Sequence, residues 1–321
     1  MDKSARIFVA GHRGLAGSAI VRELAAQGYR DVITRTHAEL DLEDAAATQR
    51  FFQEVRPQLV FLAAAKVGGI LANNSYPADF VLRNLKIEVN VIDSARLAGT
   101  ERLVFLGSSC IYPREAPQPI KEEYLLTGPL EATNRPYAIA KIAGIELCWS
   151  FNRQYGTRFL SAMPTNLYGP GDNYDLNNSH VLPALIRKMH EARTTGRDSV
   201  VIWGSGKPLR EIMHADDLAR ALVFLASLDE ARFAALTDPG VCPLINIGTA
   251  EEYSIRELAE AVARAVGYRG SFVYDTSKPD GTPRKVMEVS RIKALGWRPT
   301  VELHAGLVGA YRDFLENWAS R

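Results

Sequence analysis

Tyr137 and Lys141 form the clearest chemical pattern in the sequence, within the run YAIAK. Residues spaced i and i+4 lie on one face of a helix. A cation beside a phenol favours the phenolate and lowers the tyrosine pKa from ~10 towards neutrality. Such a tyrosine can exchange a proton with a carbinol oxygen during hydride transfer. Ser108, at the end of an expected strand, could hydrogen-bond the same oxygen. The competing interpretation is a surface Tyr–Lys pair on an amphipathic helix.

Cys110 and His180 are a second pair of proton-transfer candidates. A thiol of pKa ~8.5 and an imidazole of pKa ~6.5 titrate on either side of neutral pH. Together they could remove a proton beside a ketone and return it to the other face, which a simple reductase does not need. A buried packing cysteine and a surface histidine are the alternatives. We interpret Cys148 and Cys242 as packing or incidental residues, and no residue spacing predicts a metal site.

A glycine-rich turn follows the first expected strand, with Gly11, Gly14 and Gly17 spaced G-x-x-G-x-x-G. Glycines at this place allow a tight turn and a close approach of the backbone to a pyrophosphate at a helix N-terminus. A turn without a ligand is the alternative. The cofactor contacts expected from this turn are Gly11, His12, Arg13, Gly14, Leu15, Ala16 and Gly17, with His12 expected to be structural.

The end of the second expected strand indicates which dinucleotide binds. NAD-binding proteins of this type carry Asp or Glu there to hold the ribose 2′-hydroxyl. Here the strand runs into Arg35, and no carboxylate occurs before Glu39. Arg35 can pair with a 2′-phosphate, and Arg13 could reach the same group. The sequence therefore predicts NADP(H) as the cofactor.

The elements that must position these residues alternate between short apolar runs and longer amphipathic runs. This pattern predicts an α/β fold with a Rossmann-type doubly wound parallel sheet and a smaller α/β substrate-binding domain. In such a sheet the ligand lies at the carboxyl edge. The expected strands of the first half are Arg6–Ala10, Val32–Thr34, Leu59–Leu62, Leu103–Leu106 and Phe159–Met163. The expected helices are Ser18–Ala26, Ala45–Val55, Phe80–Leu97 and Tyr137–Tyr155.

The second half has less predicted sheet. Gly, Pro and Asn crowd Pro164–Ser179, which predicts a long ordered loop. The elements expected after it are a helix at Val181–Arg193, a strand at Val200–Trp203, a helix at Asp216–Ser227, a strand at Leu244–Ile247 and helices at Ser254–Val266 and Leu303–Trp318. We assign residues 1–165 to an NADP-binding domain and 166–321 to a substrate-binding domain, with segments near 210–250 returning to the first.

Composition narrows the class of protein. The 321 residues carry 38 Lys and Arg against 37 Asp and Glu, a net charge of +1 with no long run of like charge. Nucleic acid and membrane surfaces are therefore not expected partners. No apolar stretch approaches the ~18 residues of a membrane span, and no signal-peptide pattern opens the chain. We expect a cytoplasmic enzyme.

The combined motifs resemble the extended short-chain dehydrogenase/reductase family, which acts largely on nucleotide sugars. Longer runs resemble one of its member families, the GDP-L-fucose synthases, and extend from residue 11 to residue 285. They are Ala63–Ile70 (AAAKVGGI), Asn73–Asp79 (NNSYPAD), Gly107–Pro113 (GSSCIYP), Tyr137–Gly144 (YAIAKIAG), Pro164–Pro170 (PTNLYGP), Asn178–Pro183 (NSHVLP) and Lys278–Lys285 (KPDGTPRK).

This resemblance implies conversion of GDP-4-keto-6-deoxy-D-mannose to GDP-L-fucose, by epimerisation at C3 and C5 and then reduction at C4 with NADPH. It implies Cys110 as the base and His180 as the acid, and a homodimer formed through Phe80–Leu97 and Tyr137–Tyr155. The catalytic set it implies is Ser108, Cys110, Tyr137, Lys141 and His180. The further cofactor contacts are Asp41, Leu42, Leu106, Gly107, Lys141, Pro164, Asn166, Leu167 and His180.

The GDP-sugar is expected to bind mainly in the second half. Trp203 and Arg210 flank a glycine turn, so an aromatic face and a cation lie together. Arg187 and Lys188 follow His180, and either could meet the diphosphate; the family tends to have Arg where Lys188 stands, and Lys lacks the bidentate fork. The expected substrate contacts are Ser108, Ser109, Cys110, Asn166, Arg187, Lys188, Trp203, Arg210 and Asp280.

Two other functions stay open at this point. A nucleotide-sugar 4-epimerase or 4,6-dehydratase would share the fold, but Ser109 and Cys110 provide no carboxylate beside the catalytic serine, which argues against dehydration. A non-catalytic NADP-sensing or assembly protein would be expected to lack Ser108, Tyr137 or Lys141, and all three are present. Consumption of added NADPH separates these functions from a reductase.

Overall fold

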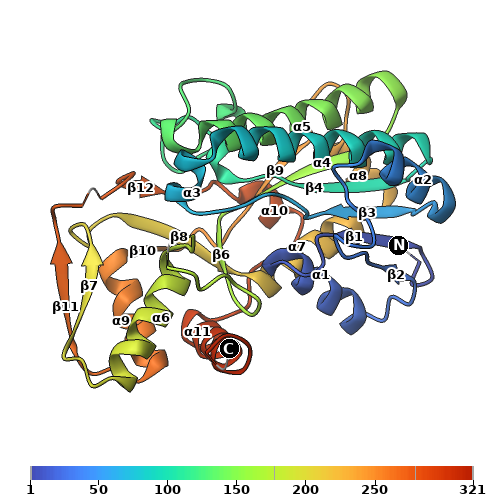
Figure 1. The fold of residues 1–321 in the computed structure, drawn as a ribbon. Coiled ribbons are helices and arrows are strands. Elements are labelled where there is room, and N and C mark those ends of the chain that lie inside the picture. Colours follow the sequence, from blue (N-terminus) through green and yellow to red (C-terminus); the bar gives the residue numbers. More distant parts are fainter. Residues whose placement is uncertain (1, 177, 279, 320–321) are drawn as a thin grey trace.

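The computed structural model describes residues 2–176, 178–278 and 280–319. Strands and helices alternate through its first half (Figure 1). They are β1 (Ile7–Ala10), α1 (Leu15–Ala26), β2 (Val32–Ile33), α2 (Ala45–Val55), β3 (Leu59–Leu62), α3 (Ile70–Ser75), α4 (Pro77–Leu97), β4 (Arg102–Leu106), α5 (Arg135–Tyr155) and β5 (Phe159–Pro164). Pro279, which belongs to the run Lys278–Lys285, lies outside the described residues.

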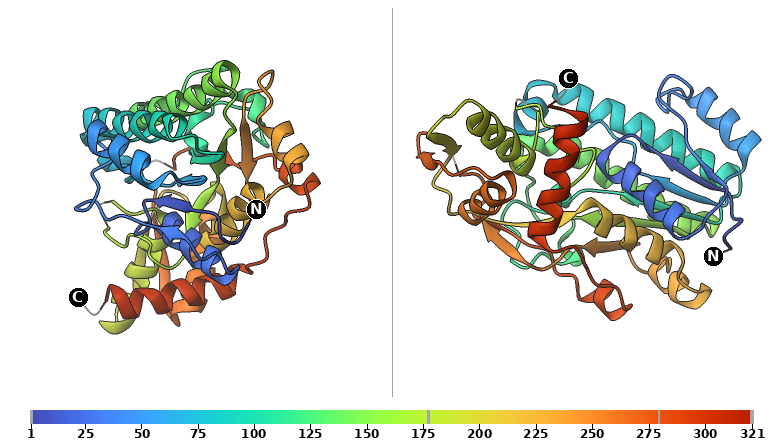
Figure 2. Two further views of the ribbon diagram at one scale, coloured as in Figure 1. Left: turned by 90° about the vertical axis from the view of Figure 1, so that its right-hand side faces the viewer. Right: turned by 90° about the horizontal axis from the view of Figure 1, so that it is seen from below.

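The second half contributes shorter strands and several helices. They are β6 (Asn166–Tyr168), α6 (Val181–Thr194), β7 (Ser199–Trp203), β8 (Leu209–His214), α7 (Ala215–Ala226), α8 (Glu230–Leu236), β9 (Leu244–Ile247), β10 (Glu252–Ser254), α9 (Ile255–Val266), β11 (Ser271–Asp275), β12 (Arg284–Lys285), α10 (Ser290–Ala294) and α11 (Leu303–Asn317). The right-hand view of Figure 2 shows α11 between the helices of this half and those beside the large sheet.

A six-stranded parallel sheet in the order β2-β1-β3-β4-β5-β9 forms the centre of the fold. Helices α2, α4 and α5 cover one face, and α1 and α7 lie against the other (Figure 1). Strands covered on both faces need apolar side chains throughout, and β1 (IFVA) and β3 (LVFL) are buried at every position. The Rossmann-type doubly wound fold is confirmed.

Two separate hydrophobic clusters stabilise the chain. One surrounds the large sheet and includes α7 and β9, which return to it from the second half. The other joins β7, α6, α9 and α11. The division at residue 165 stays a prediction, although the return of 215–247 to the large sheet agrees with the expectation for segments near 210–250.

The predicted loop Pro164–Ser179 is wrong at its start, because Asn166–Tyr168 forms β6 and pairs in parallel with β8. The strands β8, β10, β11 and β12 and the helices α3, α8 and α10 were also not predicted. Their sequences are short, and β8 is held by β6, β10 and β12, which are distant in the chain. Such elements depend on tertiary pairing more than on local periodicity.

Among the described residues, no helix combines the length and the apolarity that crossing a membrane requires. Within the same described residues, His, Cys, Asp and Glu side chains form no group of three or more that could hold a metal ion.

Candidate active site

A cavity of about 640 Å³ opens at the carboxyl edge of the large sheet. Its walls include the turns after β1, β2, β3, β4 and β5 and the segment leading to α6. Among its lining residues are the predicted cofactor contacts Gly11, Gly14, Leu15, Ala16, Gly17, Arg35, Asp41, Leu42, Leu106, Gly107, Pro164, Asn166, Leu167 and His180. The predicted contacts His12, Arg13 and Lys141 are not among them. The cavity therefore gathers most of the expected cofactor residues from five separate chain segments.

The glycine turn is shaped by close backbone approaches. Gly11 has a φ of +84°, and a Cβ there would lie 2.7 Å from the backbone nitrogen of Ala64. A Cβ on Gly17 would lie 2.1 Å from the carbonyl oxygen of Gly11. Gly14 is the N-cap of α1 and lines the cavity. The turn thus presents bare backbone and a helix N-terminus, which suits a pyrophosphate.

Arg35 lies in the cavity wall beyond β2. Its guanidinium donates to the carbonyl oxygen of Thr34 at 2.8 Å and lies over the ring of Phe51 at 5.4 Å. Neither contact neutralises its charge, and among the described residues no carboxylate forms an ion pair with it. A second cavity arginine, Arg83, is bound to Glu43 at 2.6 Å. Of these two arginines, Arg35 is therefore better placed to bind an anionic ligand.

Ser108 and Tyr137 meet inside the cavity. Ser108 follows β4 and accepts a hydrogen bond from the backbone nitrogen of Cys110 at 3.5 Å. Tyr137 lies one turn before Lys141 on α5, and the Lys141 ammonium is 5.8 Å from the phenol ring centroid. A hydrogen bond joins the Ser108 and Tyr137 side chains. The fold brings the three predicted residues together.

The expected lowering of the Tyr137 pKa is wrong. Burial raises its pKa well above the usual value, the negative charges of Cys110 and Glu88 add to this effect, and the Ser108 hydrogen bond opposes it. Burial is the main cause of the rise, and the Lys141 ammonium that was expected to lower this pKa is held by other groups. It donates to the carbonyl oxygen of Leu106 at 2.9 Å and lies 3.1 Å from Glu88 Oε1. Tyr137 therefore keeps its proton at neutral pH.

Of the two expected proton-transfer residues, His180 lines the carboxyl-edge cavity and Cys110 does not. Cys110 is 8% exposed beside Ser108, and His180 lines the cavity at the N-cap of α6. Burial raises the pKa of the thiol, although Lys285 lowers it in part. Desolvation and the Lys285 charge lower the pKa of the imidazole. Desolvation therefore moves the two pKa values apart, raising that of Cys110 and lowering that of His180.

The sequence analysis did not single out Lys285 as a site residue. It lies on β12 next to β8, and its charge acts on both Cys110 and His180. It also missed Lys66 and Asp172 in the cavity wall. Burial raises the pKa of Asp172 to about 7, with Asp313 adding to the rise. The only sequence signal for Lys285 was its place in the run Lys278–Lys285, and Lys66 lay similarly inside Ala63–Ile70.

A second group of predicted residues gathers around Trp203, whose side chain is 65% exposed at the end of β7. The Lys188 ammonium lies 5.5 Å from its ring centroid. In the turn after Trp203, the backbone nitrogen of Ser205 donates to Asp280 at 2.6 Å. Arg210 donates to the carbonyl oxygen of Thr282 at 2.7 Å, and the charge of Asp280 acts on it. The structure thus brings an aromatic face, two cations and Asp280 together.

Arg187 does not join this group. Its Nε donates to Glu191 Oε1 at 2.8 Å, and its guanidinium lies over the Trp318 ring at 4.6 Å, beside α11. It also donates to the carbonyl oxygen of Tyr174 at 3.1 Å. The prediction that Arg187 binds substrate therefore loses support, because its side chain is held by the protein. Lys188 has the better position for a ligand beside Trp203.

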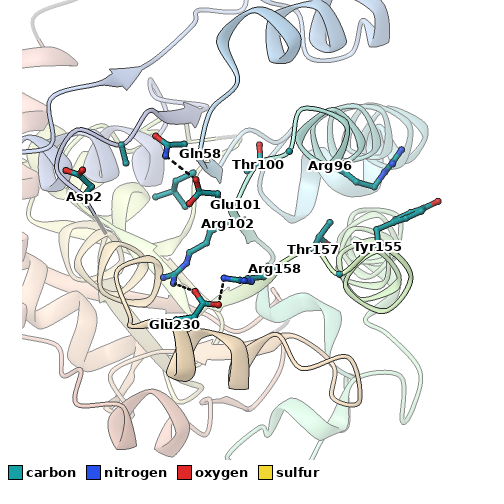
Figure 3. Close-up of a pocket in the computed structure, with 14 residues that line it drawn as sticks. Asp2, Gln58, Arg96, Thr100, Glu101, Arg102, Tyr155, Thr157, Arg158 and Glu230 are labelled. Carbon is teal, nitrogen blue, oxygen red and sulfur yellow. Dashed lines mark hydrogen bonds and ion pairs between the residues drawn. The ribbon is translucent and has the colours of Figure 1, made fainter.

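Another cavity, of about 680 Å³, lies at the amino edge of the same sheet (Figure 3). Its charged side chains already have partners. Arg102 donates to the carbonyl oxygens of Ala226 and Leu228, at 2.8 and 2.7 Å, and pairs with Glu230 at 3.3 Å. Arg158 also pairs with Glu230.

The fold and the cavity at the carboxyl edge together define a dinucleotide-binding oxidoreductase or epimerase. The family model that matches, "NAD dependent epimerase/dehydratase family", covers residues 7–236. Among its relatives, the chain is 56% identical to GDP-L-fucose synthase 1 of Arabidopsis thaliana over 100% of this chain and 96% of the relative. It is 53% identical to GDP-L-fucose synthase of Escherichia coli over 97% of each.

A solved structure of a GDP-L-fucose synthetase from Naegleria fowleri bound to NADP matches with a TM-score of 0.87. That match has 28% identity and covers 100% of this chain and 97% of the other. The chain belongs to the NAD dependent epimerase/dehydratase family and, within it, to the GDP-L-fucose synthases.

Proposed function

We propose that this protein converts GDP-4-keto-6-deoxy-D-mannose to GDP-L-fucose, by epimerisation at C3 and C5 followed by NADPH-dependent reduction at C4. The observation that carries the proposal is the 53–56% identity to GDP-L-fucose synthases across nearly the whole chain. Ser108, Tyr137 and His180 line one cavity, and the buried Cys110 lies two residues after Ser108. This arrangement supports the proposal, because the reaction needs both a reducing site and an epimerising site.

The residues of the carboxyl-edge cavity fit NADP(H). A Cβ on Gly11 or Gly17 would clash with neighbouring backbone, so these glycines allow the tight turn, and Gly14 at the N-cap of α1 lines the cavity. Arg35 would hold the 2′-phosphate that distinguishes NADPH from NADH. When bound, the cofactor supplies the hydride for C4. This chain holds the cofactor and supplies the proton.

Epimerisation depends on the 4-keto group, since loss of a proton from C3 or C5 gives an enolate. We assign proton removal to Cys110 and proton return to His180. Transfer of one proton from the Cys110 thiol to the neutral His180 imidazole gives a thiolate base and an imidazolium acid. The total number of protons on the two groups does not change. The Lys285 charge favours the thiolate and disfavours the imidazolium, so it acts on both members of the pair. Each group is expected to contribute ~10²–10⁴-fold.

Reduction then uses the protonated Tyr137. As the hydride reaches C4, the Tyr137 hydroxyl gives its proton to O4, and Ser108 hydrogen-bonds the same oxygen. The raised pKa of Tyr137 suits this direction, because an acid and not a phenolate must meet the ketone. The phenolate that remains lies one helical turn from Lys141.

The nucleotide end of the substrate belongs beside Trp203 in this proposal. The exposed indole offers a stacking face for guanine, and Lys188 and Arg210 offer charge for the diphosphate. We retain residues 166–321 as the substrate-binding part and 1–165 as the NADP-binding part, with α7 and β9 returning to the large sheet.

We further propose a cytoplasmic homodimer. Helices α4 and α5 pack side by side on one face of the sheet (Figure 1) and expose the apolar side chains of Leu82, Val89 and Ile139. A second copy covering this face would form a four-helix contact.

The test is product analysis by NMR after incubation with GDP-4-keto-6-deoxy-D-mannose and NADPH. GDP-L-fucose should form with one NADPH oxidised per sugar. A 6-deoxyhexose with the original C3 and C5 configuration would contradict the epimerase, and unchanged NADPH would contradict the reductase. Turnover without NADPH to a C4 epimer or a dehydrated sugar would identify the other family reactions.

A further inference from the structure

Glu88 is a buried acid to which the reaction above assigns no role. It lies on α4 with 1% of its surface exposed, facing α5 across the packed helix pair. Its Oε1 is 3.1 Å from the Lys141 ammonium, which also donates to the Leu106 carbonyl oxygen at 2.9 Å. Lys141 is therefore held between an acid of α4 and the last residue of β4, one helical turn from Tyr137.

The absence of a side chain at Gly144 provides the space that the Glu88 carboxylate occupies. A Cβ on Gly144, one turn after Lys141, would lie 3.0 Å from Glu88 Oε2 and 2.6 Å from the Phe105 ring. The Lys141 ammonium also lies 4.6 Å from the centroid of the Phe105 ring. Glycine at 144 thus makes room both for the acid and for the aromatic ring that packs against its partner.

Glu88 is poorly satisfied for a buried acid. Apart from its ion pair with Lys141, neither carboxylate oxygen has a hydrogen-bond partner among the described residues. Buried carboxylates normally accept several hydrogen bonds, and one that lacks them costs stability. Burial raises the pKa of Glu88 to about 7, against the opposing effect of Lys141. A group that costs stability at this place suggests a role in the reaction.

The charge of Glu88 acts on the tyrosine. It raises the pKa of Tyr137, together with Cys110 from the segment after β4. Lys141 and Cys148, both on α5, are further titratable groups that interact with Glu88. With Glu88 ionised, the charge of Lys141 is offset. Without Glu88, an uncompensated ammonium would lie one turn from the phenol and draw it towards the phenolate.

We propose that Glu88 is a positioning residue for the reduction step: it holds the Lys141 ammonium against the Leu106 carbonyl and offsets its charge, so that Tyr137 keeps the proton that it donates. The inference rests on the proposed function, because only reduction requires the tyrosine as an acid. In this step C4 gains the hydride and its electron pair, O4 gains the Tyr137 proton, and the phenolate remains beside Lys141.

The experiment is the pH dependence of kcat for NADPH oxidation in the full-length protein, compared between wild type and Glu88→Gln. Loss of the Tyr137 proton sets the alkaline limb of this profile. The glutamine variant should move that limb to lower pH by about one unit or more, because the ammonium is then uncompensated. Glu88→Asp keeps the charge but shortens the side chain, so its alkaline limb should lie between those of the wild type and Glu88→Gln.

Asp93→Asn is the matched control, since Asp93 lies on the same helix, pairs with Arg96 at 2.7 Å and is not among the residues that line the cavity. Its alkaline limb should equal that of the wild type. A folded Glu88→Gln variant with lower kcat but an unmoved limb would reduce Glu88 to a packing residue and overturn the proposal.

A second measurement needs no substrate. Ultraviolet titration of the phenolate, taken as the difference between each protein and its Tyr137→Phe partner, should show Tyr137 ionising at lower pH in Glu88→Gln. If the wild type fails to oxidise NADPH, the proposed function fails, while this titration still decides the role of Glu88. If Glu88→Gln does not fold, the neutral and apolar variant Glu88→Met gives the same decision, and an unmoved Tyr137 titration in that variant overturns the proposal.

Discussion

Two cavities of similar volume lie at opposite edges of the large sheet, about 640 Å³ at the carboxyl edge and about 680 Å³ at the amino edge. The carboxyl-edge cavity is lined by glycine backbone, a helix N-terminus and the side chains of Ser108, Tyr137 and His180. The amino-edge cavity is lined by charged side chains that bind one another (Figure 3). There, Gln58 donates to Glu101 at 3.1 Å, and Arg102 and Arg158 share Glu230.

The difference teaches that volume does not make a functional site. In a parallel sheet the carboxyl edge collects strand ends, helix N-termini and the turns between them, so unpaired donors point at one place. At the amino edge helices end and strands begin, and the charged residues satisfy one another. What separates the two cavities is how many polar groups are left for a ligand.

The largest expected effect comes from Tyr137→Phe, which should lower NADPH-dependent reduction by up to about 10⁴-fold and leave cofactor binding intact. The phenol supplies a proton and not affinity, so fluorescence titration with NADPH should match wild type. Tyr155→Phe is the control, because Tyr155 ends the same helix but lines the amino-edge cavity. Normal reduction by Tyr137→Phe would place the proton donor elsewhere.

Cys110→Ala should lower exchange of the C3 and C5 protons with deuterated solvent by about 10²–10³-fold. Mass spectrometry of sugar recovered without NADPH measures this exchange. His180→Asn should still permit abstraction but stall inversion, so exchange would outpace product formation. Cys148→Ala, which also removes a buried thiol, should exchange normally. Full deuterium incorporation by Cys110→Ala would return Cys110 to a packing role.

Arg35→Asp should weaken NADPH binding more than tenfold and bring NADPH and NADH affinities closer. A charge-assisted contact to the 2′-phosphate contributes about 1.5–3 kcal/mol. Arg96→Asp, at the amino-edge cavity, should leave both affinities unchanged. Equal NADPH affinity in Arg35→Asp and wild type, by fluorescence titration, would remove Arg35 from the cofactor site.

The smallest effect is expected at Glu230, the shared partner in the amino-edge cavity. Glu230 and Arg158 are both substantially exposed, so solvent screens their ion pair. Glu230→Gln should lower the free energy of unfolding by about 1 kcal/mol or less and change kcat and KM less than twofold. Denaturant unfolding and steady-state kinetics measure the two quantities. A large change in kcat or KM would show that the amino-edge cavity also has a function, and would contradict the difference drawn between the two cavities.

Much of the fold followed from local pattern. The expected ranges Leu59–Leu62, Ala45–Val55 and Leu244–Ile247 coincide with β3, α2 and β9. A strand buried on both faces is a short apolar run, and a helix with one apolar side has apolar residues at helical spacing. Both signals can be read from a few neighbouring residues. By contrast, β6 and β12 are three and two residues long and exist through their pairing with β8.

The candidate site divides in the same way. Residue type and spacing alone brought out the glycine turn, Arg35, Ser108 and the pair Tyr137 and Lys141, because a turn or one helical face carries each signal. The family resemblance added Asp280, which no local pattern indicated.

Only the tertiary structure decided the protonation of these groups and the direction of their side chains. It turned the Lys141 ammonium to Glu88, raised the pKa of Tyr137 instead of lowering it, and held Arg187 against Glu191. The sequence by itself determined which chemical groups this protein has and which share a turn or a helical face. Desolvation and charge come from residues distant in the chain, so the pKa of each group was set only when α4, α5 and β4 packed together.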